Sequence, residues 1–458
     1  MSSVLMVFVV LGVLYLMIQS ILKPQWALLL VLSFFPLEQL LSSYVPMLAR
    51  TSWITNVSVG LIAMAAFGLE FLRGKRPLDG YFNPIWVLVG LLYVFTVFGV
   101  LWSPIPEAGR YFIQKGFPYY ILLLIILPGL IRDIENIKKF FTPFMAVGSL
   151  IIFFILTSPH TQIYGGRLLV DLSRSTGASD DLQSPLVTAE LGGAVLIVAA
   201  LYKPTRYIKA ILLLRVITIF AGIGVMLLSG TRGQLIFAIG LSVAVFPIAH
   251  QVKNTAQFLV TSAAAGAMGL LFLLAIKIFL SGSSDSGVRW SADNIADGIS
   301  SRMYYATTIL EEYLSRPSAL LGGLGTGAFN AYASNEGDNY IYPHNLIVEI
   351  LTEHGLIGIG LLAGIFGLMA AASLRLYRNY KDDIEYRSTF AILLALCAYA
   401  TLISMKQGTY TAIPTPFFWY LVLAKIDNQT KARNAMQYID YTEYESAEYS
   451  DYSDTDLE

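Results

Sequence analysis

Long apolar runs recur along the 458-residue chain, and short polar segments separate them. Most runs hold about 17 to 25 residues, the length that a helix needs to cross about 30 Å of hydrocarbon. The alternating ten-residue segments of a transmembrane β-barrel do not occur. Hydrophobic residues make up 56% of the chain, charged residues only 13%, and the mean hydropathy is +0.63, values foreign to soluble domains of this size. The sequence therefore predicts an all-α, polytopic integral membrane protein.

The apolar runs predict twelve or thirteen transmembrane helices. Pro36 and Glu38 interrupt the second run, so this segment is either a span or a re-entrant element, and twelve is the count in the second case. The expected spans lie at 4–22, 26–47, 52–72, 84–102, 117–131, 138–158, 186–202, 208–228, 234–250, 256–280, 344–374, 386–405 and 409–425.

Lysine and arginine concentrate in alternate short loops, which in multispan proteins face the cytoplasm. The longest polar interval, residues 281–343, falls on the other side, so we expect it to form one large periplasmic loop. The basic residues that set this orientation are Arg73, Lys75, Arg76, Arg132, Lys138, Lys139, Lys203, Arg206, Lys209, Arg375, Arg378 and Lys381.

The sequence divides into a transmembrane domain, residues 1–425, and a tail, residues 426–458. From Tyr438 onward the tail holds five tyrosines and eight acids without a lysine or arginine. This composition is too charged and too poor in aliphatic residues to form a core, so we expect a disordered cytoplasmic tail. It is either a regulatory or partner-binding segment or a solvated end without a defined role.

The first candidate site residue, Arg232, lies in the motif Ser229-Gly-Thr-Arg-Gly233, between two apolar runs. The motif falls on the outer side, against the bias of basic residues toward the cytoplasm. A guanidinium group is planar and suits bidentate binding of a phosphate. The alternative is a tight turn whose arginine reaches toward the interface.

Further cations lie on the same predicted side. Arg302 begins a helix-like segment of the large loop, and Arg110 and Lys115 lie in the loop 103–116. For Arg289 and Arg316, solvation of the loop is the simpler explanation. The glycine run 322–327 lacks the preceding strand and the Gly-Lys-Ser/Thr ending of a phosphate loop, so it predicts a tight turn near the membrane.

His344 precedes a long apolar run and follows the cationic loop. Its imidazole could take a proton from an attacking hydroxyl, or it could only cap its own helix. His354 lies ten positions further and faces another side of the helix, so the two histidines do not form a metal site. The one Asp-x-Asp triplet, Asp454 to Asp456, lies in the tail, and the single Cys397 lies within an apolar run. We therefore expect neither a metal nor a cofactor.

Three motifs occur in order over about residues 225–365: S-G-T-R-G, then R-x-x-Y-x-x-x-x-x-x-E with P-x-x-x-x-G-G-L-G-x-G, then Y-P-H-N-L-I-V-E-I-L-T-E-H-G-L-I-G. This pattern resembles the O-antigen ligase and O-antigen polymerase superfamily of bacterial surface polysaccharide assembly. The resemblance implies an architecture similar to the GT-C glycosyltransferases. It also implies that Arg232 and Arg302 bind the donor diphosphate and that His344 is the general base. Arg110 and Lys115 match no motif, and their assignment to diphosphate binding depends only on side and charge.

The expected function is transfer of a glycan from an undecaprenyl-diphosphate donor to an acceptor sugar hydroxyl at the periplasmic face of the bacterial inner membrane, with inversion and without a metal. Polymerisation of exopolysaccharide or O-antigen repeat units is favoured, because a tyrosine-rich tail suits control by a co-polymerase or tyrosine kinase. Ligation to lipid A core is the alternative acceptor reaction. A transporter or flippase is the alternative of another class, for which Glu38, Glu190, Arg215 and Lys277 are available inside apolar runs. No nucleic-acid partner is expected.

Overall fold

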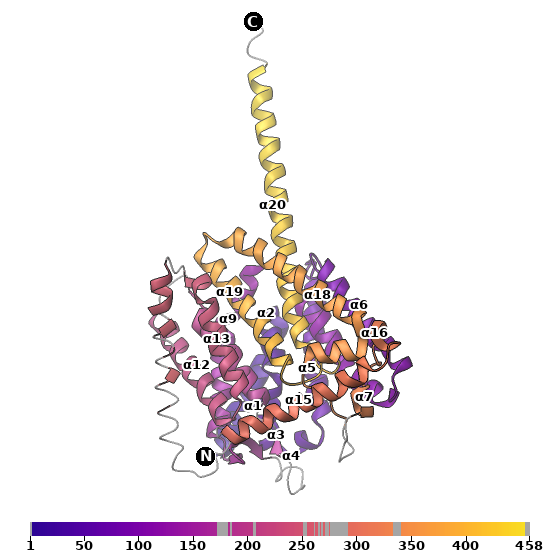
Figure 1. The fold of residues 1–458 in the computed structure, drawn as a ribbon. Coiled ribbons are helices and arrows are strands. Elements are labelled where there is room, and N and C mark those ends of the chain that lie inside the picture. The colour runs from indigo at the N-terminus through magenta and orange to yellow at the C-terminus, as the bar shows by residue number, and fades with distance from the viewer. Residues whose placement is uncertain are drawn as a thin grey trace.

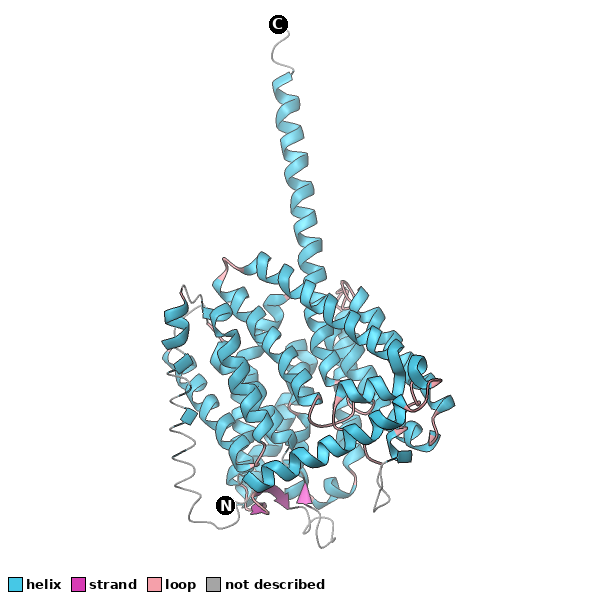
Figure 2. Cartoon of the chain, in the orientation of Figure 1, coloured by secondary structure: helices cyan, strands magenta, loops and turns pink. Residues whose placement is uncertain are grey.

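A computed structural model describes residues 2–171, 182–183, 186–204, 208–250, 254–260, 262–263, 266, 269–270, 274, 292–332 and 340–453. The described chain is a bundle of helices with one small sheet (Figures 1 and 2). The prediction of an all-α polytopic membrane protein is confirmed at this level, because many of these helices are long and apolar enough to cross a bilayer.

The first half of the chain contains α1 (Ser2–Leu22), α2 (Pro24–Leu32), α3 (Phe34–Tyr44), α4 (Pro46–Arg50), α5 (Ser52–Leu72), α6 (Pro84–Gly99), η1 (Val100–Trp102), α7 (Pro106–Ile121), η2 (Leu122–Ile126), α8 (Leu127–Leu130), α9 (Ile134–Thr157), β1 (Thr161–Tyr164), β2 (Arg167–Asp171), β3 (Leu182–Gln183) and α11 (Leu186–Leu201). The second half contains α12 (Lys209–Leu228), α13 (Arg232–His250), α15 (Ala292–Leu314), α16 (Ala319–Gly322), α17 (Phe329–Tyr332), α18 (Leu346–Tyr380), α19 (Ile384–Ser404) and α20 (Thr415–Ser453).

Eight helices of the described residues pass a length and hydropathy criterion for membrane spans: Trp53–Leu72, Pro84–Trp102, Pro106–Leu130, Ile134–Thr157, Lys209–Leu228, Arg232–His250, Leu346–Tyr380 and Ile384–Ser404. The helices α2 and α3 pass it together but are bent by 64° at Ser33, so the expected span 26–47 is a broken one or a re-entrant loop. The helices over Val7–Leu22 and Leu186–Leu201 are apolar but shorter. The expected span 256–280 lies largely outside the described residues, so the count of twelve or thirteen stays a prediction.

Several helices begin where the sequence supplies an N-cap. The Asn83 side chain accepts a hydrogen bond from Trp86 N at 3.0 Å, ahead of Pro84 at the start of α6. The Asp133 side chain accepts from Asn136 N at 2.7 Å at the start of α9, and Asp383 does the same for α19. These side chains satisfy amide groups that a helix leaves without a partner in its first turn.

The segment 103–116 was expected to be a loop before a span at 117–131, and this boundary is wrong. In the structure α7 begins at Pro106, so Arg110 and Lys115 lie on a helix that continues through η2 and α8 to Leu130. Proline is favoured in the first turn of a helix, and Glu107 adds a favourable acid there, which explains the early start. Pro118 lies inside the helix, and the π-helical turn η2 follows it.

Close helix packing in the centre depends on small residues of α11. A Cβ at Gly192 would lie 2.5 Å from a methyl group of Val225 on α12, and a Cβ at Gly193 would overlap the Tyr399 hydroxyl of α19. Small residues bring helix backbones close together in membranes, where apolar burial alone does not drive association.

The small sheet is antiparallel, with strand order β1-β2-β3. Gly165 and Gly166 join β1 to β2 with φ of 55° and 72°, the positive values that a two-residue type I′ turn requires. Arg167 pairs with Tyr164 directly after this turn. The strands lie at the end of the bundle opposite to the projecting α20 (Figure 2).

The predicted cytoplasmic loops meet at one end of the bundle. Lys425 Nζ on α20 donates to Pro77 O at 2.6 Å and to Pro128 O at 3.1 Å, which joins the loop after α5 to α8. Lys138 on α9 pairs with Glu385 at the start of α19. The segments that follow α5, precede α9 and precede α19 therefore lie at one end of the bundle, and which side of the membrane this end faces stays a prediction.

The boundary placed after residue 425 falls inside α20, which the structure continues to Ser453 as a single helix projecting from the bundle (Figure 1). The sequence predicted a disordered tail from residue 426. The first turn beyond that point is buried, because Ile426 packs in the core and Asp427 pairs with Arg375 and Lys431. The packed helix bundle thus extends at least to Thr430, which is also buried.

Candidate functional site

A polar cavity of about 830 Å³ brings together three of the five predicted site residues, Arg232, Arg302 and His344. They come from α13, α15 and the segment before α18, which are far apart in the sequence. The other lining residues are Arg167, Leu186, Ser229, Gly230, Thr231, Gly233, Ile236, Phe237, Asp297, Gly298, Ile299, Ser301, Tyr305, Tyr342, Met405, Lys406 and Gln407.

The charge of this cavity is strongly positive. Four of the described residues that line the cavity are arginine or lysine. Asp297 is the one acidic residue among the described lining residues. Cations gathered on the walls of a cleft attract anions and concentrate the field there. The cavity therefore suits a ligand with several negative charges.

The turn between α12 and α13 places Arg232 at the cavity. Gly230 has a φ of 64°, a left-handed conformation that glycine adopts at no steric cost. Thr231 is buried, and its hydroxyl donates to Met226 O at 3.1 Å. Arg232 is the first residue of α13, two positions before the predicted start of this span, and it lines the cavity.

Arg302 is held by a small hydrophobic cluster that fixes α15 beside α18. Ile309 and Tyr313 of α15 are buried in this cluster against Leu324 and Phe329, with Val348 of α18 packed on its edge. Partial desolvation, and then the nearby charge of Arg232, lower the pKa of Arg302. The two guanidinium groups are therefore close enough to interact electrostatically, which is an arrangement that an anion between them would stabilise.

His344 has an unusual backbone. Its φ is 56°, the one positive value among the non-glycine residues that the structure describes. Such strain persists where the surroundings enforce it, and it is frequent at active sites. Asn345 caps α18 by accepting from Ile347 N at 3.0 Å and Val348 N at 3.2 Å. Because Asn345 performs the capping, the alternative role of His344 as a helix cap is not needed.

Two aromatic rings flank the imidazole. The Tyr342 ring centroid lies 4.4 Å from that of His344, and the Tyr305 ring is near parallel to it at 6.4 Å. Burial, and to a smaller extent the nearby charge of Arg302, together lower the pKa of His344 to about 4. At neutral pH the imidazole is therefore uncharged and can accept a proton.

The glycine run forms the expected tight turn, and it supports α18 where that helix is kinked. Gly355 has a φ of 63° inside α18, and the carbonyl groups freed by the kink accept from the turn. Leu324 N donates to Thr352 O at 2.8 Å, and Gly325 N donates to Glu353 O at 3.0 Å. These bonds satisfy polar backbone groups within the bundle and hold α16 against α18.

The remaining predicted cations do not line the cavity. Arg110 and Lys115 lie on α7, where Lys115 Nζ is 5.5 Å from the centroid of the Tyr111 ring. Arg316 pairs with Glu312, and its guanidinium carbon lies 5.2 Å from the centroid of the Tyr332 ring. Arg289 lies outside the described residues. The predicted side of the membrane and the positive charge were thus not sufficient to predict whether Arg110 and Lys115 line this cavity.

Two cations of the cavity, Arg167 and Lys406, were missed by the sequence interpretation. Arg167 lies on the sheet, which the hydropathy pattern did not predict, and Lys406 lies in a segment of three residues between two expected spans. Lys406 stands on the predicted periplasmic side against the charge bias, which was the same signal that pointed to Arg232.

His354 belongs to a separate buried network and not to the cavity. Its Nε2 atom lies 3.1 Å from Thr96 Oγ1 and contacts the Tyr410 hydroxyl, while Thr326 Oγ1 donates to Thr96 O at 2.5 Å. The sequence argument treated both histidines as residues of one helix, but His344 precedes α18 and only His354 lies on it; His344 lines the cavity and His354 does not. Among the described residues, no group of three His, Cys, Asp or Glu side chains could hold a metal.

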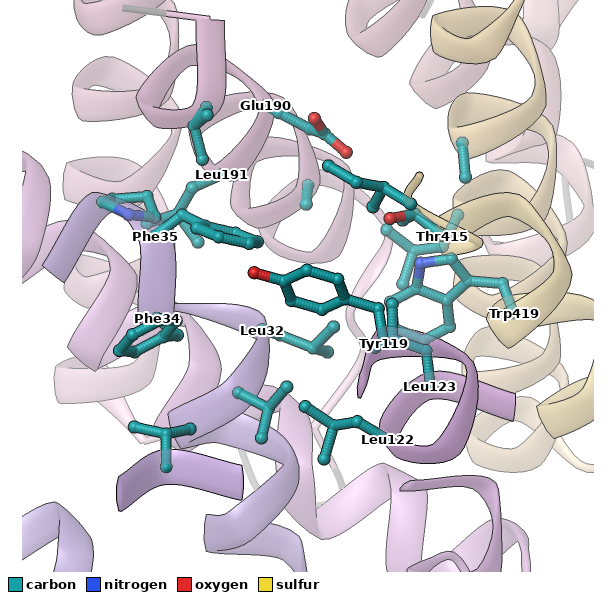
Figure 3. A pocket seen from close by; sticks show the side chains of 18 of the residues that line it. Leu32, Phe34, Phe35, Tyr119, Leu122, Leu123, Glu190, Leu191, Thr415 and Trp419 are labelled. Atoms are coloured by element: carbon teal, nitrogen blue, oxygen red, sulfur yellow. The ribbon is translucent and has the colours of Figure 1, made fainter. Parts of the chain in front are cut away.

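A second cavity, of about 160 Å³, is mainly apolar (Figure 3). It lies beside the bend between α2 and α3 and is lined by Phe35, Tyr119 and Trp419, with the carboxylate of Glu190 at its border. It offers few hydrogen-bond donors, so it suits an apolar group better than a phosphate.

Comparisons with protein-family models and with curated proteins find no match for this chain. The family resemblance therefore depends on the motifs, and what it implies enters below as a proposal.

Proposed function

We propose that this chain is a membrane-embedded glycosyltransferase of the O-antigen ligase and polymerase type, with the GT-C-like architecture of that class. The observation that carries the proposal is the meeting of Arg232, Arg302 and His344 in one cationic cavity at the end of the bundle opposite to the basic loops. In this proposal the cavity faces the periplasm of a bacterial inner membrane and takes an undecaprenyl-diphosphate-linked glycan.

The donor fits the cavity by charge. The diphosphate lies against Arg232 and Arg302, and its negative charge offsets the repulsion between the two guanidinium groups. A lipid-linked donor reaches such a site from the bilayer, which explains why the cavity is built from the ends of helices and not in a separate soluble domain.

The reaction follows from these positions. The acceptor hydroxyl oxygen attacks the anomeric carbon, and its proton passes to the neutral imidazole of His344. The bond between the anomeric carbon and the phosphate oxygen breaks, and the diphosphate leaves with the electron pair. The guanidinium groups stabilise the charge that develops on this leaving group. Attack on the face opposite to the diphosphate inverts the anomeric centre.

Donor binding also makes His344 a stronger base. Arg302 is one of the two causes that lower the pKa of His344 in the empty cavity. A bound diphosphate counters the Arg302 charge, so the pKa of His344 rises toward its ordinary value once the donor is present.

Within this class we retain polymerisation of repeat units, because the tyrosine-rich end of the chain suits a partner with tyrosine-kinase or co-polymerase function. Ligation to lipid A core uses the same chemistry with another acceptor. The test is to incubate purified protein with an undecaprenyl-diphosphate glycan and to analyse the product. Chain extension supports polymerisation, transfer to lipid A core supports ligation, and no release of undecaprenyl diphosphate with either acceptor contradicts the proposed function.

Transport of a lipid or polysaccharide is the second candidate. The observation that favours it is Glu190, an acid at the border of the apolar cavity. Glu38 accepts from Thr55 and Asn56, and Arg215 donates to backbone carbonyl groups, so both have structural roles. Lys277 lies outside the described residues. Movement of labelled lipid-linked glycan across liposomes by the wild type, but not by Glu190→Gln, would favour this candidate.

A further inference from the structure

Lys406 lines the cationic cavity from a different part of the fold than the two arginines. It lies in the segment between α19 and α20, whereas Arg232 and Arg302 come from α13 and α15. Backbone hydrogen bonds fix this segment, since Lys406 N and Gln407 N both reach Ile403 O at 2.9 Å. The side chain thus starts from an ordered turn.

A buried glutamine orients the ammonium group. Lys406 Nζ donates to Gln234 Oε1 at 2.6 Å, and Gln234 Nε2 donates to Gln407 Oε1 at 2.6 Å. Gln234 is fully buried at 0% exposure, so its amide has a defined position. The partner that orients this ammonium group is an uncharged amide, whereas Lys138 pairs with the carboxylate of Glu385 elsewhere in the protein.

Gly233 leaves room for this arrangement. A Cβ at Gly233 would lie 2.5 Å from Lys406 Cδ and 2.8 Å from Lys406 Nζ, closer than real contacts allow. Because Gly233, the last residue of the S-G-T-R-G motif, has no side chain, the Lys406 side chain can pack directly against the backbone next to Arg232. The motif supplies one cation and makes space for another.

We infer that Lys406 is a third cation for the lipid diphosphate and makes the site prefer a diphosphate to a monophosphate, with Gln234 as its positioning residue. The inference rests on the proposed function, since it assigns a further ligand to the same donor. Two guanidinium groups that already interact with each other can bind one phosphate bidentately. A cation on another wall extends the positive surface toward a second phosphate.

The experiment compares the binding of undecaprenyl diphosphate and undecaprenyl monophosphate to full-length protein in nanodiscs. Wild type should bind the diphosphate more tightly. Lys406→Met should lower the ratio of the two affinities by about tenfold or more, the scale of one hydrogen bond to a charged group, because it weakens diphosphate binding more than monophosphate binding. Lys406→Arg should restore part of the preference, and Gln234→Leu should lose part of it.

Lys139→Met is the matched control, because Lys139 is an exposed lysine on α9 at the end with the basic loops. An unchanged affinity ratio in Lys406→Met, or equal loss of both lipids, overturns this inference and leaves the proposed function standing. A wild type without any preference for the diphosphate overturns the donor assignment itself.

Discussion

Glu353 on α18 accepts a hydrogen bond from the backbone N–H of Gly327 at 2.9 Å. This bond joins the end of the glycine run to the helix that begins just after His344. Asn330, three residues further, donates to Gly327 O at 3.1 Å and to Ile341 O at 2.9 Å, so it ties the same turn to the segment that leads into His344. The glycine run is therefore part of the support of the proposed base.

Gly323→Ala should destabilise the protein much more than the adjacent change Gly322→Ala. Gly323 has a φ of 77°, and an added Cβ would overlap the Glu353 backbone. The ψ of −177° at Gly323 completes a backbone conformation that essentially only glycine adopts, which costs a residue with a side chain about 1–3 kcal/mol. Thermal unfolding in detergent should show a clearly lower Tm. Gly322→Ala is the control, because nothing lies within 4 Å of its added Cβ; equal Tm values for both variants would contradict the geometry.

Arg232→Ala and Arg302→Ala should each abolish glycan transfer while the protein stays folded, because each removes a proposed diphosphate ligand. Lysine at either position should restore little activity, since an ammonium group cannot reproduce the bidentate fork. Arg316→Ala is the control, an arginine near α15 that pairs with Glu312 outside this cavity. Full transfer activity in both cavity variants would refute the diphosphate assignment.

His344→Ala should keep donor binding and lower kcat by about 10²- to 10⁴-fold, the effect of removing a general base. His344→Asn is a useful second variant, because asparagine tolerates the positive φ of this position. His354→Ala should lower the Tm, since it removes a buried ring that contacts Thr96 and Tyr410, but should reduce kcat less. A His344→Asn enzyme with normal kcat would show that the base lies elsewhere.

The pH profile of kcat/KM should report the pKa of His344 in the protein without bound donor. Only neutral imidazole accepts a proton, and the pKa of His344 is lowered to about 4. Activity should therefore stay level from about pH 8 down to pH 5.5 and fall as the pH approaches 4. A decline centred near the ordinary histidine value of about 6.5 would mean that another group controls the reaction.

Transfer should continue in excess EDTA, since the proposed chemistry uses guanidinium groups where many glycosyltransferases use a divalent cation. The measurement is the release of undecaprenyl diphosphate before and after chelation, with Mg²⁺ added back as the control. Loss of activity that Mg²⁺ restores would require a metal in the donor site.

Reporter fusions should place the two ends of the bundle on opposite sides of the membrane. A fusion after Arg76, Lys139 or Lys209 should report the cytoplasm, and one within 292–332 should report the periplasm. Lys425 contacts both Pro77 and Pro128, so reporters after either loop should agree. A cytoplasmic signal from 292–332 would place the cavity on the wrong side for a periplasmic acceptor.

The membrane class, most span positions and the tight glycine turn could be predicted from the sequence, because hydropathy and positive-φ turns depend on residues close together in the chain. Arg232, Arg302 and His344 were selected because they stand in motifs with a defined order and spacing, and the structure brings them to one cavity. The start of α7 and the extension of the bundle through Thr430 were missed, since a helix end depends on what packs against it as well as on local composition.

The membership of the cavity was decided by the tertiary structure alone. Arg110 and Lys115 share the predicted side and charge of the site residues, yet they lie outside it, while Arg167 and Lys406 line it from a hairpin and a short turn. The sequence by itself determines which segments enter the bilayer, because the free energy of transfer from water to hydrocarbon is the sum of contributions from the residues of one segment. Which side chains meet depends on how helices rotate and pack against one another, and contacts such as Lys406 with Gln234 join positions 172 residues apart.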